Sequence, residues 1–233
     1  MYTQDGGKVE FLARGGSKSL AKLTPHLEMA AESDFMLVQG RHYKILAGVE
    51  RRRSFANIYD NLFKMTLAKN ALHLVDIGTC ADEDDSAVYE LLKNWLNFIN
   101  ETNEFSRGRA SFLLGSFAWN LMAITGYLPE LHRCLSCRDA IRVGMYKWHG
   151  LRGGVVCERC IDKNTEHWFA SRQISDQTIK LIRFSLQESF INQLNPHISG
   201  QLLDDFHEVT ESFIVSHFPT IPANSIRASC SLI

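Results

Sequence analysis

Two Cys-X-X-Cys pairs lie within residues 134–160, which read CLSCRDAIRVGMYKWHGLRGGVVCERC. The first pair is Cys134 with Cys137, the second is Cys157 with Cys160, and nineteen residues separate the two pairs. This spacing is typical of four-cysteine zinc sites, in which two short turns each direct two thiolates at one ion. Four protein ligands complete the tetrahedron and leave no position for water, so such a site stabilises a fold and activates no substrate. We therefore predict one structural Zn²⁺ on these four cysteines.

Other interpretations of the cysteines stay open. His132 or His149 lies near enough in sequence to replace one thiolate in a Cys3His site. The site could also be a relict without metal, or the pairs could be redox dithiols, although neither pair follows a thioredoxin-like strand–helix junction. Disulfides are disfavoured because the polar first residues contain no export signal. Cys80 and Cys230 fit neither pair and are interpreted as bystanders.

Helical periodicity surrounds the cysteine segment. Apolar residues recur at helical spacing on both sides of it, with polar caps at the starts and glycine or proline beyond the ends. Strands of a zinc ribbon are expected within Arg142–Gly154. We predict a helical domain over residues 54–233 that carries a zinc module inserted at 130–172. The predicted helices span or begin at Asn57–Val75, Ser86 after the acidic run Asp82–Asp85, Arg107–Thr125, Ser175 or Asp176, and Ser199.

The first 53 residues have a β pattern. Short strand candidates at 8–13, 27–30, 35–38 and 42–49 alternate with glycine-containing turns, which favours a small barrel or sheet. The fold class expected is therefore α+β, with a β domain over residues 1–53 ahead of the helical domain.

Composition and charge narrow the possible partners. The chain is 45% hydrophobic and 22% charged, as in a globular protein, and its net charge of −1 argues against coating nucleic acid by bulk charge. Residues 1–53 and 134–172 each carry +3, whereas 54–133 carry −4 and 173–233 carry −3. A polyanion should therefore meet the first and third blocks.

Two further classes of function are disfavoured. The uncharged stretch from Ala110 to Pro129 contains too many polar residues for a membrane span and is expected to be a buried helix. The sequence contains no phosphate-binding loop, dinucleotide fingerprint, metalloprotease motif or nucleophile elbow. We therefore expect no enzyme and no membrane contact, and a location in the cell interior.

The segments that contain the cysteine pairs resemble those of a known family. Residues 125–137 (TGYLPELHRCLSC) and 153–160 (GGVVCERC) resemble the signature of RecO, a bacterial recombination-mediator family. The segments Asp5–Val9, Ala13–Leu20 and Pro25–Glu28 are similar to the amino-terminal domain of that family. The metal segment is the most specific part of the resemblance.

The resemblance implies a fold and a function. It implies an amino-terminal OB-fold, here incomplete because family members have one more strand before the segment matching Tyr2–Gly7, then a helical domain with a four-cysteine zinc ribbon. It also implies DNA repair and recombination in the cytoplasm, in association with the nucleoid. The implied activities are binding and annealing of single-stranded DNA, displacement of the single-strand-binding protein SSB through its C-terminal tail, and loading of RecA with RecR. No cofactor other than zinc is implied.

Binding of single strands without sequence preference needs cations for phosphates and aromatic faces for bases. The predicted DNA contacts are Lys8, Arg14, Lys18, Lys22, Arg51, Arg52 and Arg53. A second candidate surface surrounds the zinc module and consists of Arg138, Arg142, Lys147, Arg152 and Arg159. For both sets the alternative is an ordinary solvated charge. Trp148 and Trp168 are expected to be packing residues.

Two competing functions stay open. The first is a zinc-stabilised protein–protein adaptor without DNA binding. The second is a metal-dependent nuclease or another enzyme whose site carries no recognisable motif. Annealing of complementary strands, capture of a partner without annealing, and turnover distinguish the three hypotheses.

Overall fold

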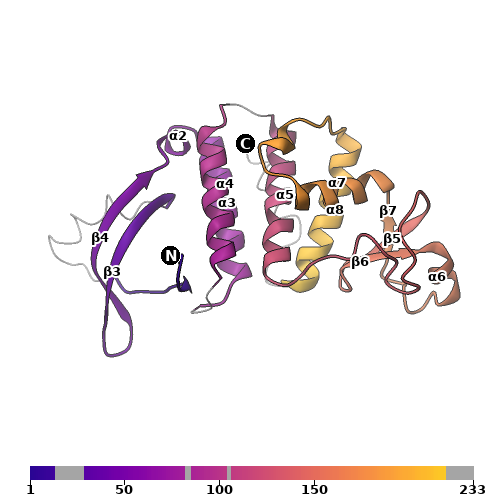
Figure 1. Cartoon of the computed structure of the whole chain (residues 1–233), viewed down its shortest axis with the longest axis horizontal. Helices are drawn as coiled ribbons and strands as arrows, with labels where there is room; N and C mark the ends of the chain where they lie inside the picture. The colour runs from indigo at the N-terminus through magenta and orange to yellow at the C-terminus, as the bar shows by residue number, and fades with distance from the viewer. Residues whose placement is uncertain (14–28, 82–84, 104–105, 219–233) are drawn as a thin grey trace. The chain divides into compact units, whose positions relative to one another are not determined.

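A computed structural model describes residues 1–13, 29–81, 85–103 and 106–218 (Figure 1). The chain divides by its internal contacts into two compact units, Met1–Asn103 and Glu104–Ile233. The helices that follow residue 54 therefore group with the β-strands in the first unit. The domain boundary near residue 53 stays a prediction.

The strands of the first unit form two hairpins. Strand β1 (Tyr2–Thr3) pairs with β2 (Gly7–Lys8), and the turn predicted at residues 5–7 is present, with Gly7 at φ 57°. Strand β3 (Ala31–Gln39) pairs antiparallel with β4 (Lys44–Ser54) along its whole length, with two register shifts.

The predicted strand over residues 8–13 is much shorter than expected. Val9 exchanges backbone hydrogen bonds with Met1, which draws the chain back towards its own start. Only Leu12 reaches β4, where its N–H donates to the carbonyl of Lys44 and its carbonyl accepts from Leu46. Among the described residues of this unit the strands do not close into a barrel, so the OB-fold stays a prediction.

The described residues of the first unit form the helices α2 (Ala56–Tyr59), α3 (Leu62–Gly78) and α4 (Ser86–Glu101). The single helix predicted over 57–75 is divided because the Asn61 side chain accepts from the first amides of α3 and starts a new helix there. Helix α4 begins at the predicted place, with Asp85 as its cap. Its buried residues are Val88, Leu92, Trp95, Leu96 and Ile99, which recur at helical spacing.

The second unit contains α5 (Arg107–Ile124), α7 (Asp176–Gln187) and α8 (Gly200–His217), which begin at the serine caps Ser106, Ser175 and Ser199. The uncharged stretch that begins at Ala110 is the buried part of α5, as predicted. No helix in the described part of the chain has the length and apolar character needed to cross a bilayer.

Helix α7 ends at Gln187, well before the predicted stop at Asn195. The chain then forms a short 3-10 helix, η2 (Asn192–Leu194). The side-chain amide of Gln193 donates to the carbonyls of Ser185 and Glu188, so it satisfies carbonyl groups that the end of α7 leaves without helical partners.

A three-stranded antiparallel sheet lies between α5 and α7 in sequence. Strand β5 (Tyr146–His149) is central, with β6 (Gly154–Cys157) and β7 (Arg172–Ile174) on either side, and α6 (Glu158–Lys163) follows β6. Strands were expected at β5 and the start of β6, whereas β7 was not. Trp148 of β5 packs against Trp119 and Phe213 and donates to Ser212 of α8, as expected for a packing residue.

Replacing Gly115 with alanine is expected to destabilise the second unit. The added Cβ would lie 2.6 Å from Cε1 of the buried Phe206. Overpacking costs about 1–3 kcal/mol, typically more than the ~1 kcal/mol that alanine gains over glycine in a helix. Gly108→Ala in the same helix is the control, because its Cβ would meet Leu203 at an ordinary 3.5 Å. Urea denaturation should show a lower midpoint for Gly115→Ala alone; equal midpoints would contradict the tight packing.

Candidate metal centre

The four predicted cysteine ligands converge. The sulfur atoms of Cys134, Cys137, Cys157 and Cys160 all lie within 4.8 Å of one another. The Cys137 and Cys157 sulfurs are 3.8 Å apart, which matches the edge of about 3.8 Å expected for a tetrahedron with Zn–S bonds of about 2.3 Å. All four are free thiols rather than disulfides. The arrangement therefore fits one ion bound by four thiolates.

The first pair lies in a tight chain reversal. The amide of Cys134 donates to the Asp139 carbonyl, and the amide of Arg138 donates back to the Cys134 carbonyl. Arg138 adopts a left-handed backbone with φ 63°, the single non-glycine residue in the described chain to do so. This conformation turns the chain directly after Cys137, so that two thiols three positions apart point to one side.

The second pair lies at a strand–helix junction, so the expectation from sequence that neither pair follows one was wrong. Cys157 ends β6 and precedes the first residue of α6, while Cys160 lies in the first turn of that helix. The two junctions are tied together by backbone hydrogen bonds from Leu135 to Val155 and from Glu130 to Gly153. The metal module therefore holds its two pairs together through main-chain bonds as well as through any bound ion.

A small apolar core lies beneath the sulfur atoms. Cys134 and Cys160 belong to a buried cluster with Val156, Ile161 and Trp168. Cys137 is exposed and Cys157 is half-buried. Two ligands therefore face the interior of the module and two face solvent.

Without a bound cation, the thiols of the cluster differ in their pKa values. Burial raises the pKa of the Cys134 thiol, but hydrogen bonds from the amides of Cys157, Cys137 and Ser136 outweigh it and lower the pKa to about 7. The amide of Asp139 lowers the pKa of Cys137, but desolvation and the neighbouring thiols raise it to about 12. Burial and adjacent thiols likewise raise the pKa of Cys157. Full ionisation of the cluster therefore needs a compensating cation, which suits a thiophilic divalent metal.

Two charged side chains that sequence analysis did not assign to the metal centre support its shape. Arg159 pairs with Asp139 at 2.8 Å and so bridges the two cysteine pairs on the surface. Burial raises the pKa of Glu130, but its carboxylate accepts the amides of His132 and Arg133, and these bonds lower the pKa overall. Glu130 lies three residues before Arg133, a spacing that could have indicated a local turn cap.

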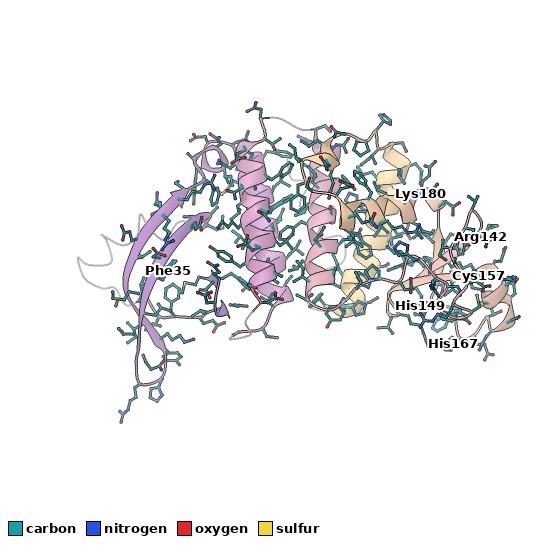
Figure 2. The ribbon with its side chains drawn as sticks, in the orientation of Figure 1. Phe35, Arg142, His149, Cys157, His167 and Lys180 are labelled. Carbon is teal, nitrogen blue, oxygen red and sulfur yellow. The ribbon has the colours of Figure 1, made fainter. Side chains whose placement is uncertain are left out.

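The histidines are outside the cluster. The described residues offer only the four cysteines as a metal-binding group of three or more side chains, so neither His132 nor His149 belongs to it. His149 accepts from the Arg152 amide and contacts the edge of Trp168, which His167 contacts from another direction (Figure 2). Burial lowers the pKa of His149. The imidazole of His149 thus packs inside the ribbon.

Several predicted DNA contacts already have carboxylate partners. Lys8 pairs with Asp76 at 2.7 Å, Arg52 pairs with Asp34, and Arg53 lies 3.4 Å from Glu101. Arg51 is a half-buried residue of β4. Arg14, Lys18 and Lys22 lie outside the described residues. Among the described residues, the structure therefore does not gather Lys8, Arg51, Arg52 and Arg53 into one open basic track.

Three of the five cations around the zinc module likewise already contact a carboxylate or an aromatic ring. Arg159 pairs with Asp139, Arg138 lies 3.7 Å from Glu130, and the guanidinium of Arg152 lies 5.1 Å from the centroid of the Trp168 ring. Arg142 is exposed and Lys147 half-buried (Figure 2 labels Arg142). Trp168 is buried, as expected for packing.

The fold and the site define a helical protein with a four-cysteine module, and comparison with known proteins assigns its family. Residues 59–224 match the model of the family described as recombination protein O, C-terminal. The chain therefore belongs to the RecO family, whose role is DNA repair and recombination.

Relatives from several bacteria match most of the chain, and each is called DNA repair protein RecO. The relative from Dehalococcoides mccartyi is 26% identical over 88% of this chain and 77% of its own length. The Alkaliphilus metalliredigens protein is 22% identical over 97% and 89%. The Clostridium perfringens protein is 27% identical over 93% and 91%.

Serine at position 137 is expected to reduce metal binding strongly. Cys137→Ser removes one of the four donors, so the loss of affinity should exceed the ~10–100-fold that removal of an outer-shell partner costs. Mass spectrometry of the metal content per chain checks this after dialysis. Cys80→Ser is the control, because Cys80 is exposed and lies in the other unit. Equal metal content in the two variants would contradict the assigned ligand set.

Gly154→Ala is expected to loosen the metal centre without touching a ligand. Its Cβ would lie 2.8 Å from Cδ2 of Leu135 and 2.9 Å from the Glu130 carbonyl oxygen, so the first cysteine pair must shift. Overpacking of this kind costs about 1–3 kcal/mol. A chelator competition should show faster metal release than in wild type. Gly200→Ala is the control, since nothing lies within 4 Å of its Cβ; identical release rates would refute the close approach.

Proposed function

We propose that this protein is a recombination mediator that binds and anneals single-stranded DNA. In this role it helps to displace SSB through the C-terminal tail of that protein and to load RecA together with RecR. The observation that carries the proposal is the family match over residues 59–224, which includes all four cysteines. The chain acts without turnover in this proposal, and the cytoplasm, where chromosomal DNA lies, is its proposed compartment.

The proposed metal is zinc, in a structural role. Four thiolates in a tetrahedral arrangement suit Zn²⁺, which supplies rigidity and no reaction in such a site. The module then acts as a brace, because Trp148 of β5 packs edge-on against Trp119 of α5 and Phe213 of α8, which stack on each other. Loss of the ion should therefore loosen the helical unit as well as the ribbon.

The proposed DNA contacts remain Arg14, Lys18, Lys22, Lys8 and the triplet at 51–53. The paired cations among them are exposed or near the surface, and exposed ion pairs contribute only about 0–1 kcal/mol. A phosphate chain can therefore replace a carboxylate partner at little cost. The ion pairs explain how residues 1–53 can carry +3 while their described cations form no continuous cationic surface.

An annealing assay tests this function. Complementary oligonucleotides labelled with a donor and an acceptor dye should anneal faster with the full-length, zinc-loaded chain than alone. The acceleration should fall as salt rises, because phosphate contacts release counterions. Metal content is measured on the same sample.

Two controls separate the competing functions. Capture of RecR or an SSB-tail peptide without any annealing would replace the proposal with a protein–protein adaptor. Degradation of either oligonucleotide would instead indicate an enzyme. Acceleration that does not change with salt would contradict phosphate contacts.

A further inference from the structure

The turn between β3 and β4 projects from the first unit. In Figure 1 this end of the hairpin extends past the ends of α3 and α4. The turn comprises Gly40–Tyr43, and the Gly40 amide donates to the Tyr43 carbonyl at 3.0 Å to close it. We call residues 39–44 (QGRHYK) the hairpin tip.

The hairpin tip exposes an aromatic ring beside a cation. Tyr43 is 65% exposed, and its ring contacts His42 edge-on at 6.4 Å between centroids. Arg41 is exposed, and its guanidinium forms no ion pair with any other residue that the structure describes.

Charge divides the hairpin into two halves. At its base the cations are neutralised by carboxylates, as in Arg52 with Asp34 and Arg53 with Glu101. The tip contains no acidic residue. Among the described arginines of the hairpin, Arg41 is therefore available to a polyanion, whereas Arg52 and Arg53 at the base already have carboxylate partners.

An apolar strip leads along β3 to the tip. Met36 and Val38 are 65% and 47% exposed and alternate with Phe35 and Leu37, which face inward. The ring of Phe35 packs at a tilt against Phe11, with centroids 5.7 Å apart, so the inner face already has a partner (Figure 2 labels Phe35). The outer face offers apolar contacts next to a cation and an exposed ring.

We infer that the hairpin tip is a binding site for single-stranded nucleic acid, with Tyr43 as a stacking platform for a base and Arg41 as a phosphate contact. An unpaired base presents a π-face that stacks on an aromatic ring, and the adjoining phosphate needs a cation. A duplex hides both base faces and cannot use Tyr43 in this way. The inference rests on the proposed single-strand binding and locates part of that activity at residues not assigned to it by sequence.

The turn is held rigidly enough to present these groups. A Cβ on Gly40 would lie 2.7 Å from the Tyr43 carbonyl oxygen and 2.8 Å from Cδ1 of Ile45, so only glycine fits. Leu12 adds two backbone hydrogen bonds to β4 at Lys44 and Leu46, next to the turn. A fixed platform loses less conformational entropy on binding than a mobile one.

Substitutions at the tip test the inference by fluorescence anisotropy with a labelled oligo-dT and the zinc-loaded full chain. Loss of one stacked base corresponds to about 1–3 kcal/mol, so Tyr43→Ala should bind about 5- to 160-fold more weakly. Tyr43→Phe should bind like wild type, because it keeps the ring. Arg41→Gln should also reduce the magnitude of the salt slope by about 0.7, the value for one phosphate contact on a single strand.

Matched controls come from the second unit. Phe169 is an aromatic residue that is 84% exposed, and Arg107 is an exposed cation at the start of α5. Phe169→Ala and Arg107→Gln should leave the affinity and the salt slope unchanged. Equal losses in these variants would overturn the assignment to the tip.

A spectroscopic readout reports contact directly. The native tryptophans Trp95, Trp119, Trp148 and Trp168 are at most 5% exposed. Tyr43→Trp therefore adds one solvent-exposed indole, whose emission oligo-dT should quench on stacking, whereas a duplex of equal length should not. Quenching by both, or by neither, would overturn the inference.

The outcomes distinguish failure of the proposed function from failure of the role assigned to the hairpin tip. Wild-type protein that ignores oligo-dT at low salt overturns the proposed function itself. Wild-type protein that binds oligo-dT while Tyr43→Ala and Arg41→Gln bind equally well overturns only the role of the tip. Circular dichroism of each variant confirms that the fold is retained.

Discussion

Four sulfur atoms within 4.8 Å of one another impose the constraint on which the second unit depends. Thiolates at that distance repel one another, and neutral thiols make only weak hydrogen bonds, so the arrangement is favourable chiefly when a cation occupies its centre. The chain supplies the geometry through a left-handed residue after the first pair and a strand–helix junction at the second. The main chain thus brings the sulfurs together, and an ion would supply the attraction between them.

One side chain, that of Trp148, connects the cysteine module to the helices of the second unit. Trp148 is fully buried, contacts the stacked rings of Trp119 and Phe213 edge-on, and donates its indole N–H to Ser212. A ribbon of three short strands buries little area alone, and below about 40 residues such modules usually need a metal or a partner. Here the partner is the α5–α8 pair, so the ribbon and the helices stabilise each other.

Local chemistry made much of this structure predictable. The convergence of the four cysteines followed from spacing alone, and the helix starts at Ser86, at Asp176 and after Ser199 followed from side chains that can satisfy free amides. The structural features that the sequence did not predict depend on contacts between residues distant in sequence. Strand β7 is only three residues long and exists because β5 offers it an edge, while Lys8 takes Asp76 as its partner across 68 positions. Neither pairing produces a periodic pattern in the sequence from which it could be predicted. The exposed ring at Tyr43 was likewise hidden, because alternation predicts a strand but not which turn projects.

The order of elements also affects how the second unit assembles. Helices α5 and α7 meet through Ser116 and Asn120, which both donate to the Ser185 carbonyl, yet the whole cysteine module separates them in sequence. Bringing the two helices together therefore closes a long loop, which is entropically unfavourable and slow. An ion bound early by the cysteines would divide that loop into shorter closures. Metal supply during synthesis would then govern how quickly newly made chains reach the native state, and not merely how stable they are once there.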